Sequence, residues 1–383
     1  MEKGKNENNE KILENENNYE NELIKILINC FNKKVNVIII GKPGTGKTYT
    51  IYSAANLLSN LLNKKLIIYH KLNDKEKEEL LKQEDLSNYF ILVDVKLQSA
   101  DVNKFSMFIL DKNFEPKELI SNDLLILTKK NCYGILLFDE INMASPQLQS
   151  ILFEIFLNKK ISQYTLGENV MIVGTGNRYE NIASNPIPKP LLNRVLLIDF
   201  DNYFNENYLE NWINWAIKNN IDKRIISFVK LYGLEVLYDF PEEEFEQITT
   251  PRSYELLNKL INNVDDIEEI KIYSYGLLSK KVANKFITFI TLILKLDLDN
   301  VINNNVVFTN SKIDEKVGYI YLLSKNYKNK DKDKVIKFIE FLIDNFTELA
   351  TLLILLNKND KDFVNFLIQN ITKEKLIKFG KYL

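Results

Sequence analysis

The sequence predicts an α/β fold built on a parallel sheet, followed by an all-helical part. Strand and helix patterns alternate through the first half of the chain, and strands that alternate with helices form parallel sheets. Helical patterns then dominate from residue 205 to the end. Five apolar, β-branched runs are typical of buried strands: 35–40, 90–95, 133–138, 170–173 and 195–200.

The change in pattern at residue 205 predicts how the chain divides. Residues 1–19 form a low-complexity polar tail, and an α/β core is expected at 20–204. A helical domain is expected at 205–296, and a C-terminal helical extension at 297–383. Apolar residues at helical spacing predict helices at 20–31, 49–62, 146–158, 208–218, 223–232, 252–262, 275–294, 317–323, 334–356 and 361–371.

The connections between strands give weaker signals. The charged run 71–83 favours a solvated helical insertion, and 66–69 is a short strand or a helix end. Residues 161–169 predict a β-hairpin with Gly167 near its turn. Residues 96–121 have the mixed composition of a loop and carry apolar side chains that we expect to be exposed: Phe105, Met107, Phe108 and Ile109.

Composition indicates an ordinary soluble protein. The 383 residues are 45% hydrophobic and 27% charged, with a formal net charge of −2, so no nucleic-acid or membrane partner is required. Cys30 and Cys132 are expected to be buried free thiols, and His70 a structural side chain. No apolar run reaches the ~20 residues of a membrane span, and the N-terminus has no signal-peptide core, so we expect a cytoplasmic protein.

The stretch GKPGTGKT at 41–48 lies between the predicted strand 35–40 and the helix 49–62. Glycines let the backbone curl so that N–H groups point at phosphate oxygens, and the helix N-terminus favours an anion. Lys47 can reach the β- and γ-phosphates, and the Thr48 hydroxyl can ligate Mg²⁺. The alternative is a chance glycine-rich turn. The candidate nucleotide-binding residues are Gly41, Lys42, Pro43, Gly44, Thr45, Gly46, Lys47, Thr48 and Tyr49.

Two carboxylates follow the predicted strand 133–138. Ligands of open α/β sheets lie beyond the carboxyl ends of the strands, which is where Asp139 and Glu140 stand. Asp139 is the candidate Mg²⁺ ligand, and Glu140 is the candidate general base that polarises a water. The alternative is a strand that simply ends in acids at a loop.

Three more residues are candidates for the catalytic site. Asn177 ends the next strand, where an amide could orient a water beside Glu140, or could merely belong to a turn. Arg194 precedes the fifth strand and could stabilise transition-state charge, or could form a surface salt bridge. Arg252 follows Thr250-Pro251, a helix-start signature, and could point toward the nucleotide or only into solvent.

In this order the motifs resemble those of AAA+ ATPases, over residues 35–296. In that family's terms, 41–48 is Walker A, 135–140 Walker B, Asn177 sensor 1, Arg194 the arginine finger and Arg252 sensor 2. The closer resemblance is to MoxR-type and dynein-related members. It rests on LFDEIN at 137–142 with Ser145-Pro146, GTGNR at 174–178, PLLNR at 190–194, TPRSY at 250–254 and DVKLQ at 94–98.

The resemblance implies ATP and Mg²⁺ as cofactors, a P-loop core with a helical lid at 205–296, and a homo-oligomeric ring, usually a hexamer. It also implies a chaperone-like remodeller of a protein client, often one with a von Willebrand A domain. An assembly or regulatory switch with slow hydrolysis is the alternative. A nucleic-acid-associated NTPase is a weaker one, because the sequence has no basic arm.

Overall fold

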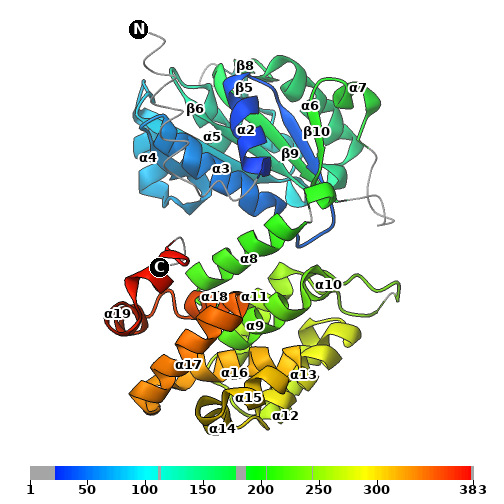
Figure 1. Ribbon diagram of the computed structural model, residues 1–383. Coiled ribbons are helices and arrows are strands. Elements are labelled where there is room, and N and C mark those ends of the chain that lie inside the picture. Colours follow the sequence, from blue (N-terminus) through cyan, green and yellow to red (C-terminus); the bar gives the residue numbers. More distant parts are fainter. Residues whose placement is uncertain (1–21, 111–113, 178–186, 204, 244, 381–383) are drawn as a thin grey trace. The chain divides into compact units, whose positions relative to one another are not determined.

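The computed structural model describes residues 22–110, 114–177, 187–203, 205–243 and 245–380, in two compact units, 1–204 and 205–383 (Figure 1). The polar tail expected at 1–19 and Arg178 of the GTGNR motif lie outside the described residues. Among the helices of the described ranges, none combines the length and the apolar character needed to cross a bilayer.

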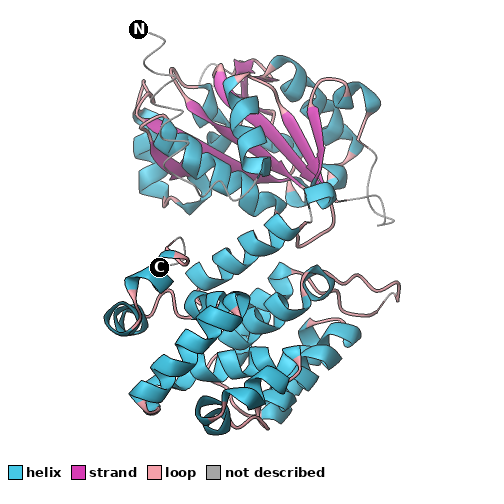
Figure 2. Cartoon of the chain, in the orientation of Figure 1, coloured by secondary structure: helices cyan, strands magenta, loops and turns pink. Residues whose placement is uncertain are grey.

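The first unit is built on a sheet of six parallel strands, which Figure 2 shows as one layer flanked by helices. This confirms the predicted α/β class with its parallel sheet. The central strands are almost entirely apolar and buried, as expected of a sheet covered on both faces. In spatial order the strands are β10 (Leu196–Asp199), β1 (Val37–Ile40), β9 (Asn169–Gly176), β6 (Tyr133–Asp139), β3 (Tyr89–Lys96) and β2 (Lys65–Ile68).

Helices connect these strands at the predicted places. Ser145 caps α6, where its Oγ accepts from Leu148 N at 3.3 Å, and Pro146 takes the first helical position. The helices of this unit are α2 (Glu22–Asn32), α3 (Lys47–Leu61), α4 (Asp74–Lys82), α5 (Asn122–Leu125), α6 (Pro146–Asn158) and α7 (Lys189–Leu192). Short 3₁₀ helices are η1 (Tyr69–Lys71), η2 (Leu97–Ser99), η3 (Val102–Lys104), η4 (Ile126–Thr128), η5 (Ile141–Met143) and η6 (Phe200–Tyr203).

The expected loop at 96–121 was wrong in part, because it contains an antiparallel hairpin of β4 (Met107–Leu110) and β5 (Pro116–Leu119). Met107, Phe108 and Ile109 are exposed, as expected. Phe105 is buried instead, with its ring centroid 6.1 Å from that of Phe138. A second small hairpin, β7 (Lys160–Ile161) and β8 (Tyr164–Thr165), turns at 162–163, so Gly167 lies after it. Gly167 N donates to Leu127 O at 2.9 Å.

The second unit, 205–383, is helical and has its own hydrophobic core. Phe228 of α9 lies at its centre, edge-on to Phe286 of α13 with ring centroids 5.1 Å apart. A division of this unit at residue 296 stays a prediction. Its helices are α8 (Glu206–Lys218), α9 (Lys223–Tyr232), α10 (Leu234–Leu237), α11 (Pro251–Ile261), α12 (Ile267–Leu277), α13 (Lys280–Ile293), α14 (Leu298–Asn303), α15 (Asn305–Asn310), α16 (Ile313–Asn326), α17 (Lys332–Asn345), α18 (Thr347–Leu356), α19 (Lys361–Asn370) and α20 (Lys373–Ile377), with η7 at Tyr327–Asn329.

Two predicted long helices are each broken. The run 275–294 divides before α13, because Ser279 leaves the helical path and accepts from Val282 N as an N-cap. The run 334–356 divides at Phe346, whose extended φ of −140° ends α17 and starts α18. In both places apolar periodicity continues across the break and hides it.

Candidate active site

The glycine-rich loop joins the end of β1 to the start of α3. Gly44 and Gly46 have φ values of 71° and 99°, in the left-handed region that glycine adopts without strain. Gly41 packs so closely on η6 that an added Cβ would lie 2.9 Å from Phe200 Cβ. Lys42 N donates to Asp201 Oδ1 at 3.0 Å, and Thr45 Oγ1 donates to Lys42 O at 2.8 Å. The loop is therefore fixed at both sides and ends at the N-terminus of a 15-residue helix.

Lys47 is the first residue of α3, and its side chain is folded over the loop. Only 8% of Lys47 is exposed. Its Nζ donates to Gly41 O at 2.9 Å, to Lys42 O at 2.7 Å and to Asn177 Oδ1 at 3.0 Å. The ammonium charge is therefore held inside the curve of the loop, where a bound phosphate chain would need it. Tyr49, the last of the predicted loop contacts, is 59% exposed.

Thr48 and Asp139 face each other from α3 and the end of β6. Thr48 Oγ1 donates to Asp139 Oδ1 at 3.3 Å, and Thr175 of β9 donates to the same carboxylate oxygen. A hydroxyl and a carboxylate are the hard oxygen donors that Mg²⁺ takes, with its remaining ligands from water and phosphate. Among the described residues no group of three or more His, Cys, Asp and Glu side chains could hold a metal alone. Thr48 and Asp139 are thus the pair that would hold Mg²⁺ beside a nucleotide.

Glu140 lies in an unusual backbone conformation. Its φ and ψ are 59° and 51°, a left-handed geometry that is costly for a residue with a side chain and is found most often at functional sites. The turn is held by Thr175, whose Oγ1 accepts from Glu140 N at 3.3 Å, and by Met143 N, which donates to Glu140 O at 2.8 Å. Glu140 follows β6 directly, at the carboxyl end of the sheet's strands, where the glycine-rich loop also lies.

A third acid, Asp94, lies near Asp139 and was not selected from the sequence as a site residue. Tyr52, one helical turn after Thr48, donates to Asp94 Oδ2 at 2.9 Å. The other oxygen, Oδ1, is buried and has no hydrogen-bond partner in the described part of the chain. Burial raises the pKa of Asp94, the Tyr52 bond opposes this, and the nearby charge of Asp139 adds to the rise.

Asn177 follows β9 directly and meets Lys47 through its side chain. Its backbone is bonded to the side chain of Asn142, another residue that the sequence interpretation did not single out. The phosphate loop, Asp139, Glu140 and Asn177 are thus gathered at one end of the sheet, beside the carboxyl ends of the neighbouring strands β1, β9 and β6.

Arg194 lies at the opposite end of the same sheet, beside the amino ends of its strands. It precedes β10, whose first residue, Leu196, pairs with Val37 at the amino end of β1. Its side chain is exposed, with the guanidinium 5.7 Å from the centroid of the Phe153 ring. It borders a hollow of about 650 Å³ that Lys34 and Lys159 also line. The glycine-rich loop follows the carboxyl end of β1, so this loop and Arg194 lie at opposite ends of the same strand.

Arg252 belongs to the helical unit. It is the second residue of α11, exposed, and preceded by Thr250 at the N-cap and Pro251 at the first position, as the signature predicted. Its role at a nucleotide stays a prediction.

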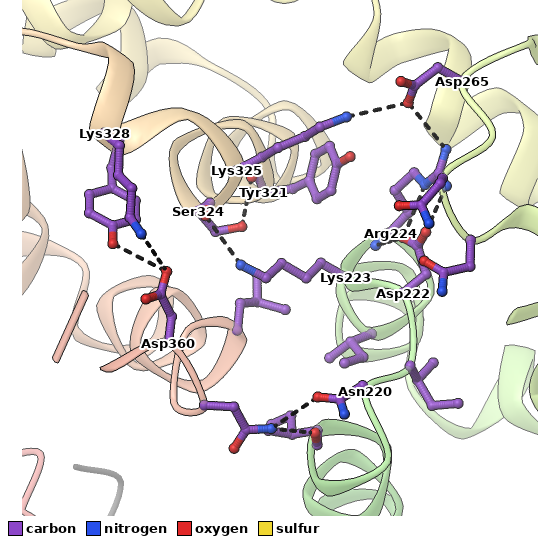
Figure 3. Close-up of a pocket in the computed structure, with 18 residues that line it drawn as sticks. Asn220, Asp222, Lys223, Arg224, Asp265, Tyr321, Ser324, Lys325, Lys328 and Asp360 are labelled. Atoms are coloured by element: carbon purple, nitrogen blue, oxygen red, sulfur yellow. Dashed lines mark hydrogen bonds and ion pairs between the residues drawn. The ribbon is translucent and has the colours of Figure 1, made fainter. Parts of the chain in front are cut away.

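A separate hollow of about 720 Å³ lies within the helical unit (Figure 3). Arg224 pairs with Asp222 there at 2.6 Å and donates to Val264 O and Ile261 O at 2.7 and 2.8 Å. Lys223 Nζ donates to Asn357 Oδ1 at 2.7 Å and Ser324 O at 3.2 Å, and burial lowers its pKa. These bonds tie α9 to its neighbours, so the charges have a structural role.

Residues 36–195 match a family model described as an AAA domain of the dynein-related subfamily. This segment is therefore similar to an AAA domain. The matched segment runs from the residue before β1 to the residue before β10, and contains the loop 41–48, Asp139, Glu140, Asn177 and Arg194. Arg252 lies outside it.

Two solved structures resemble the chain weakly. One, provisionally described as an ATPase from Cytophaga hutchinsonii, is 16% identical with a TM-score of 0.33, over 72% of this chain and 88% of that chain. The other, a point variant of RuvB from Thermotoga maritima, is 12% identical with a TM-score of 0.30, over 93% of this chain and 85% of that chain. TM-scores this low establish no functional relationship. Among curated proteins, no sequence matches significantly.

Proposed function

We propose that this chain is a Mg²⁺-dependent ATPase of the MoxR type that assembles into a ring and remodels a protein client. ATP binding rests on the loop 41–48 with Lys47 inside it, and Mg²⁺ on Thr48 and Asp139, 3.3 Å apart. Glu140, on its left-handed turn, would draw a proton from the attacking water. Asn177, hydrogen-bonded to Lys47, would orient that water.

The position of Arg194 carries the proposal of a ring. A guanidinium at the amino end of the sheet cannot meet phosphates bound at the carboxyl end of the same sheet. It is exposed and lies beside other cations, so it is available to a second copy of the chain. We therefore assign it to the γ-phosphate of a neighbouring subunit, where an arginine finger contributes about 10³–10⁵ in turnover. Six subunits are expected from the family.

An exposed apolar hairpin supports a protein client. Strand β4 shows four consecutive side chains to solvent, with Phe108 70% and Leu110 64% exposed. Contiguous exposed apolar groups mark interaction surfaces, so this hairpin suits contact with an apolar segment of a protein client. A von Willebrand A domain protein is the expected partner, and the cytoplasm the expected location.

Mixing two inactive variants tests the ring and the finger together. Lys47→Ala subunits cannot use ATP but keep Arg194, whereas Arg194→Ala subunits keep a sound pocket and lack the finger. Mixed rings form complete sites where the two types meet, so part of the lost turnover should return and vary with the mixing ratio. Lys34→Ala is the control, because it removes another exposed cation from the hollow that Arg194 borders and should keep full activity.

Three outcomes contradict the proposal. Normal turnover by Arg194→Ala makes that side chain a surface residue, and an inactive Arg194→Ala without rescue makes it act within its own subunit. A single monomeric species in light scattering, with and without a slowly hydrolysed ATP analogue, removes the ring. ATP-dependent assembly with negligible turnover would favour the regulatory switch, and stimulation by DNA would favour the nucleic-acid-associated NTPase.

A further inference from the structure

We propose that Asn142 is a positioning residue that aims Asn177 at the nucleotide site. This inference rests on the proposed ATPase function and adds a residue to it. Asn142 lies in η5, two residues after Glu140, and is 3% exposed. It does not contact the phosphate loop in any bond of the described residues, and would act through Asn177 alone.

One amide side chain holds both backbone groups of Asn177. Asn142 Nδ2 donates to Asn177 O at 3.2 Å, and Asn142 Oδ1 accepts from Asn177 N at 3.1 Å. A side-chain amide can give and accept one bond each in this way, as the backbone of a neighbouring strand would. Because both groups are fixed, the backbone of Asn177 has little freedom to rotate.

The sheet itself does not hold Asn177. The pairing of β9 with β6 ends at Gly174, opposite Phe138, and its pairing with β1 ends at Gly176, opposite Ile40. The two bonds from Asn142 therefore hold the residue that follows β9, beyond the last paired residue of the strand. Gly176 permits this approach, since a Cβ there would lie 3.2 Å from Asn142 Oδ1.

The residue whose backbone Asn142 holds is the one whose side chain meets Lys47. Asn177 Oδ1 accepts from Lys47 Nζ at 3.0 Å. The turn that carries Glu140 also carries Asn142, and hydrogen bonds join Asn142 to Asn177 and Asn177 to Lys47. Loss of the Asn142 bonds would let Asn177 drift relative to Glu140, and a displacement of about 1 Å can cost about 10²-fold in rate.

A purely structural role predicts a different result, and Asn36 provides the matched control. Asn36 is 9% exposed, and its amide also bridges a backbone carbonyl and a backbone N–H: Phe156 O and Ile172 N, both at 3.0 Å. It lies just before β1, at the amino end of the sheet. The two asparagines therefore share burial and bonding but differ in distance from the nucleotide site.

The experiment compares Asn142→Ala, Asn36→Ala, Asn177→Ala and the Asn142→Ala/Asn177→Ala double variant. Both single changes at 142 and 36 should lower the urea midpoint to a similar extent. Of these two variants, only Asn142→Ala should lower kcat, by roughly 10–100-fold, with the KM for ATP little changed. The double variant should be no slower than Asn177→Ala, because Asn142 then has nothing left to position.

The inference is overturned if the losses at 142 and 177 multiply in the double variant, if Asn142→Ala keeps the wild-type kcat, or if Asn36→Ala loses kcat equally. Should Asn142→Ala fail to fold, Asn142→Ser retains a short hydroxyl and takes its place in every comparison. A wild-type protein that does not turn over ATP contradicts the proposed function itself, which separates the two failures.

Discussion

Lys47 Nζ donates to Asn177 Oδ1 across 3.0 Å and so joins the first residue of α3 to the residue after β9. The two are 130 positions apart in sequence, and they belong to motifs that were selected separately. Their contact means that the group expected to hold phosphate and the group expected to orient water share one bond. A bound nucleotide that drew Lys47 away would also release Asn177.

Lys47→Ala should abolish nucleotide binding, because it removes the cation that is held inside the loop by Gly41 O and Lys42 O. Titration with a fluorescent ATP analogue measures the effect. Lys75→Ala removes the same charge from an exposed position on α4 and should bind like the wild type. Equal affinity for Lys47→Ala and wild type would show that 41–48 is not a phosphate loop.

Asp139→Asn should raise the Mg²⁺ concentration needed for tight nucleotide binding, since a neutral amide is a poorer ligand than a carboxylate. Its bonds to Thr48 and Thr175 can persist, so the fold should be retained. The measurement is a nucleotide-binding titration at several Mg²⁺ concentrations. An unchanged Mg²⁺ requirement would remove Asp139 from the metal site.

Asp94→Asn should stabilise the α/β unit at neutral pH. Burial raises the pKa of Asp94 in the folded state, so the ionised carboxylate costs stability once the pH exceeds its unfolded pKa of about 3.9. Its favourable contribution is complete below that value and is lost as the pH rises through the folded pKa. Thermal unfolding by circular dichroism should show a gain for Asp94→Asn at pH 7 that shrinks toward pH 4. A gain that grows on acidification would contradict the raised pKa.

Asp222→Ala should destabilise the helical unit by about 3–5 kcal/mol, because it removes the buried carboxylate from Arg224 and leaves only the exposed Asp265, 3.9 Å away, to offset its charge. The side chains of Asp222 and Arg224 are 11% and 7% exposed. Both tryptophans, Trp212 and Trp215, belong to this unit, so fluorescence in urea reports its unfolding.

Glu268→Ala is the control for that measurement. Its pair with Lys271 is equally short, at 2.6 Å, but the two side chains are 72% and 36% exposed, so the loss should stay below about 1 kcal/mol. Equal losses at the two positions would show that the buried pair has no special role.

The sequence predicted the elements whose signal is local. Buried strands such as 133–138 have continuous apolar, β-branched runs, and the loop 41–48 has a spacing that few other structures require. Asp139 and Asn177 could be assigned to the same end of the sheet, because the carboxyl ends of parallel strands lie side by side. The sequence-based boundaries were short at β9, which extends to Gly176 and so brings Thr175 to Asp139.

Features that depend on tertiary contacts could not be predicted. Asn142 resembles any polar residue after a strand until the turn at Glu140 brings its amide to Asn177. Phe105 looked exposed because its neighbours are, yet its ring packs on Phe138 of a strand far along the chain. The neighbours of Arg194 are also tertiary: β10 pairs with β1, and Arg194 lines one hollow with Lys34 and Lys159, which no local pattern contains.

The most direct test of the ATPase is the single-turnover hydrolysis of ATP by the wild type and by Glu140→Gln. Glu154→Gln makes the same change on the exposed face of α6 and is the matched control. Glu140→Gln should bind ATP as the wild type does and release phosphate about 10²–10⁴ times more slowly, the range for loss of a general base, while Glu154→Gln keeps the wild-type rate. Equal rates for Glu140→Gln and wild type, or no hydrolysis by the wild type, would contradict the proposed function.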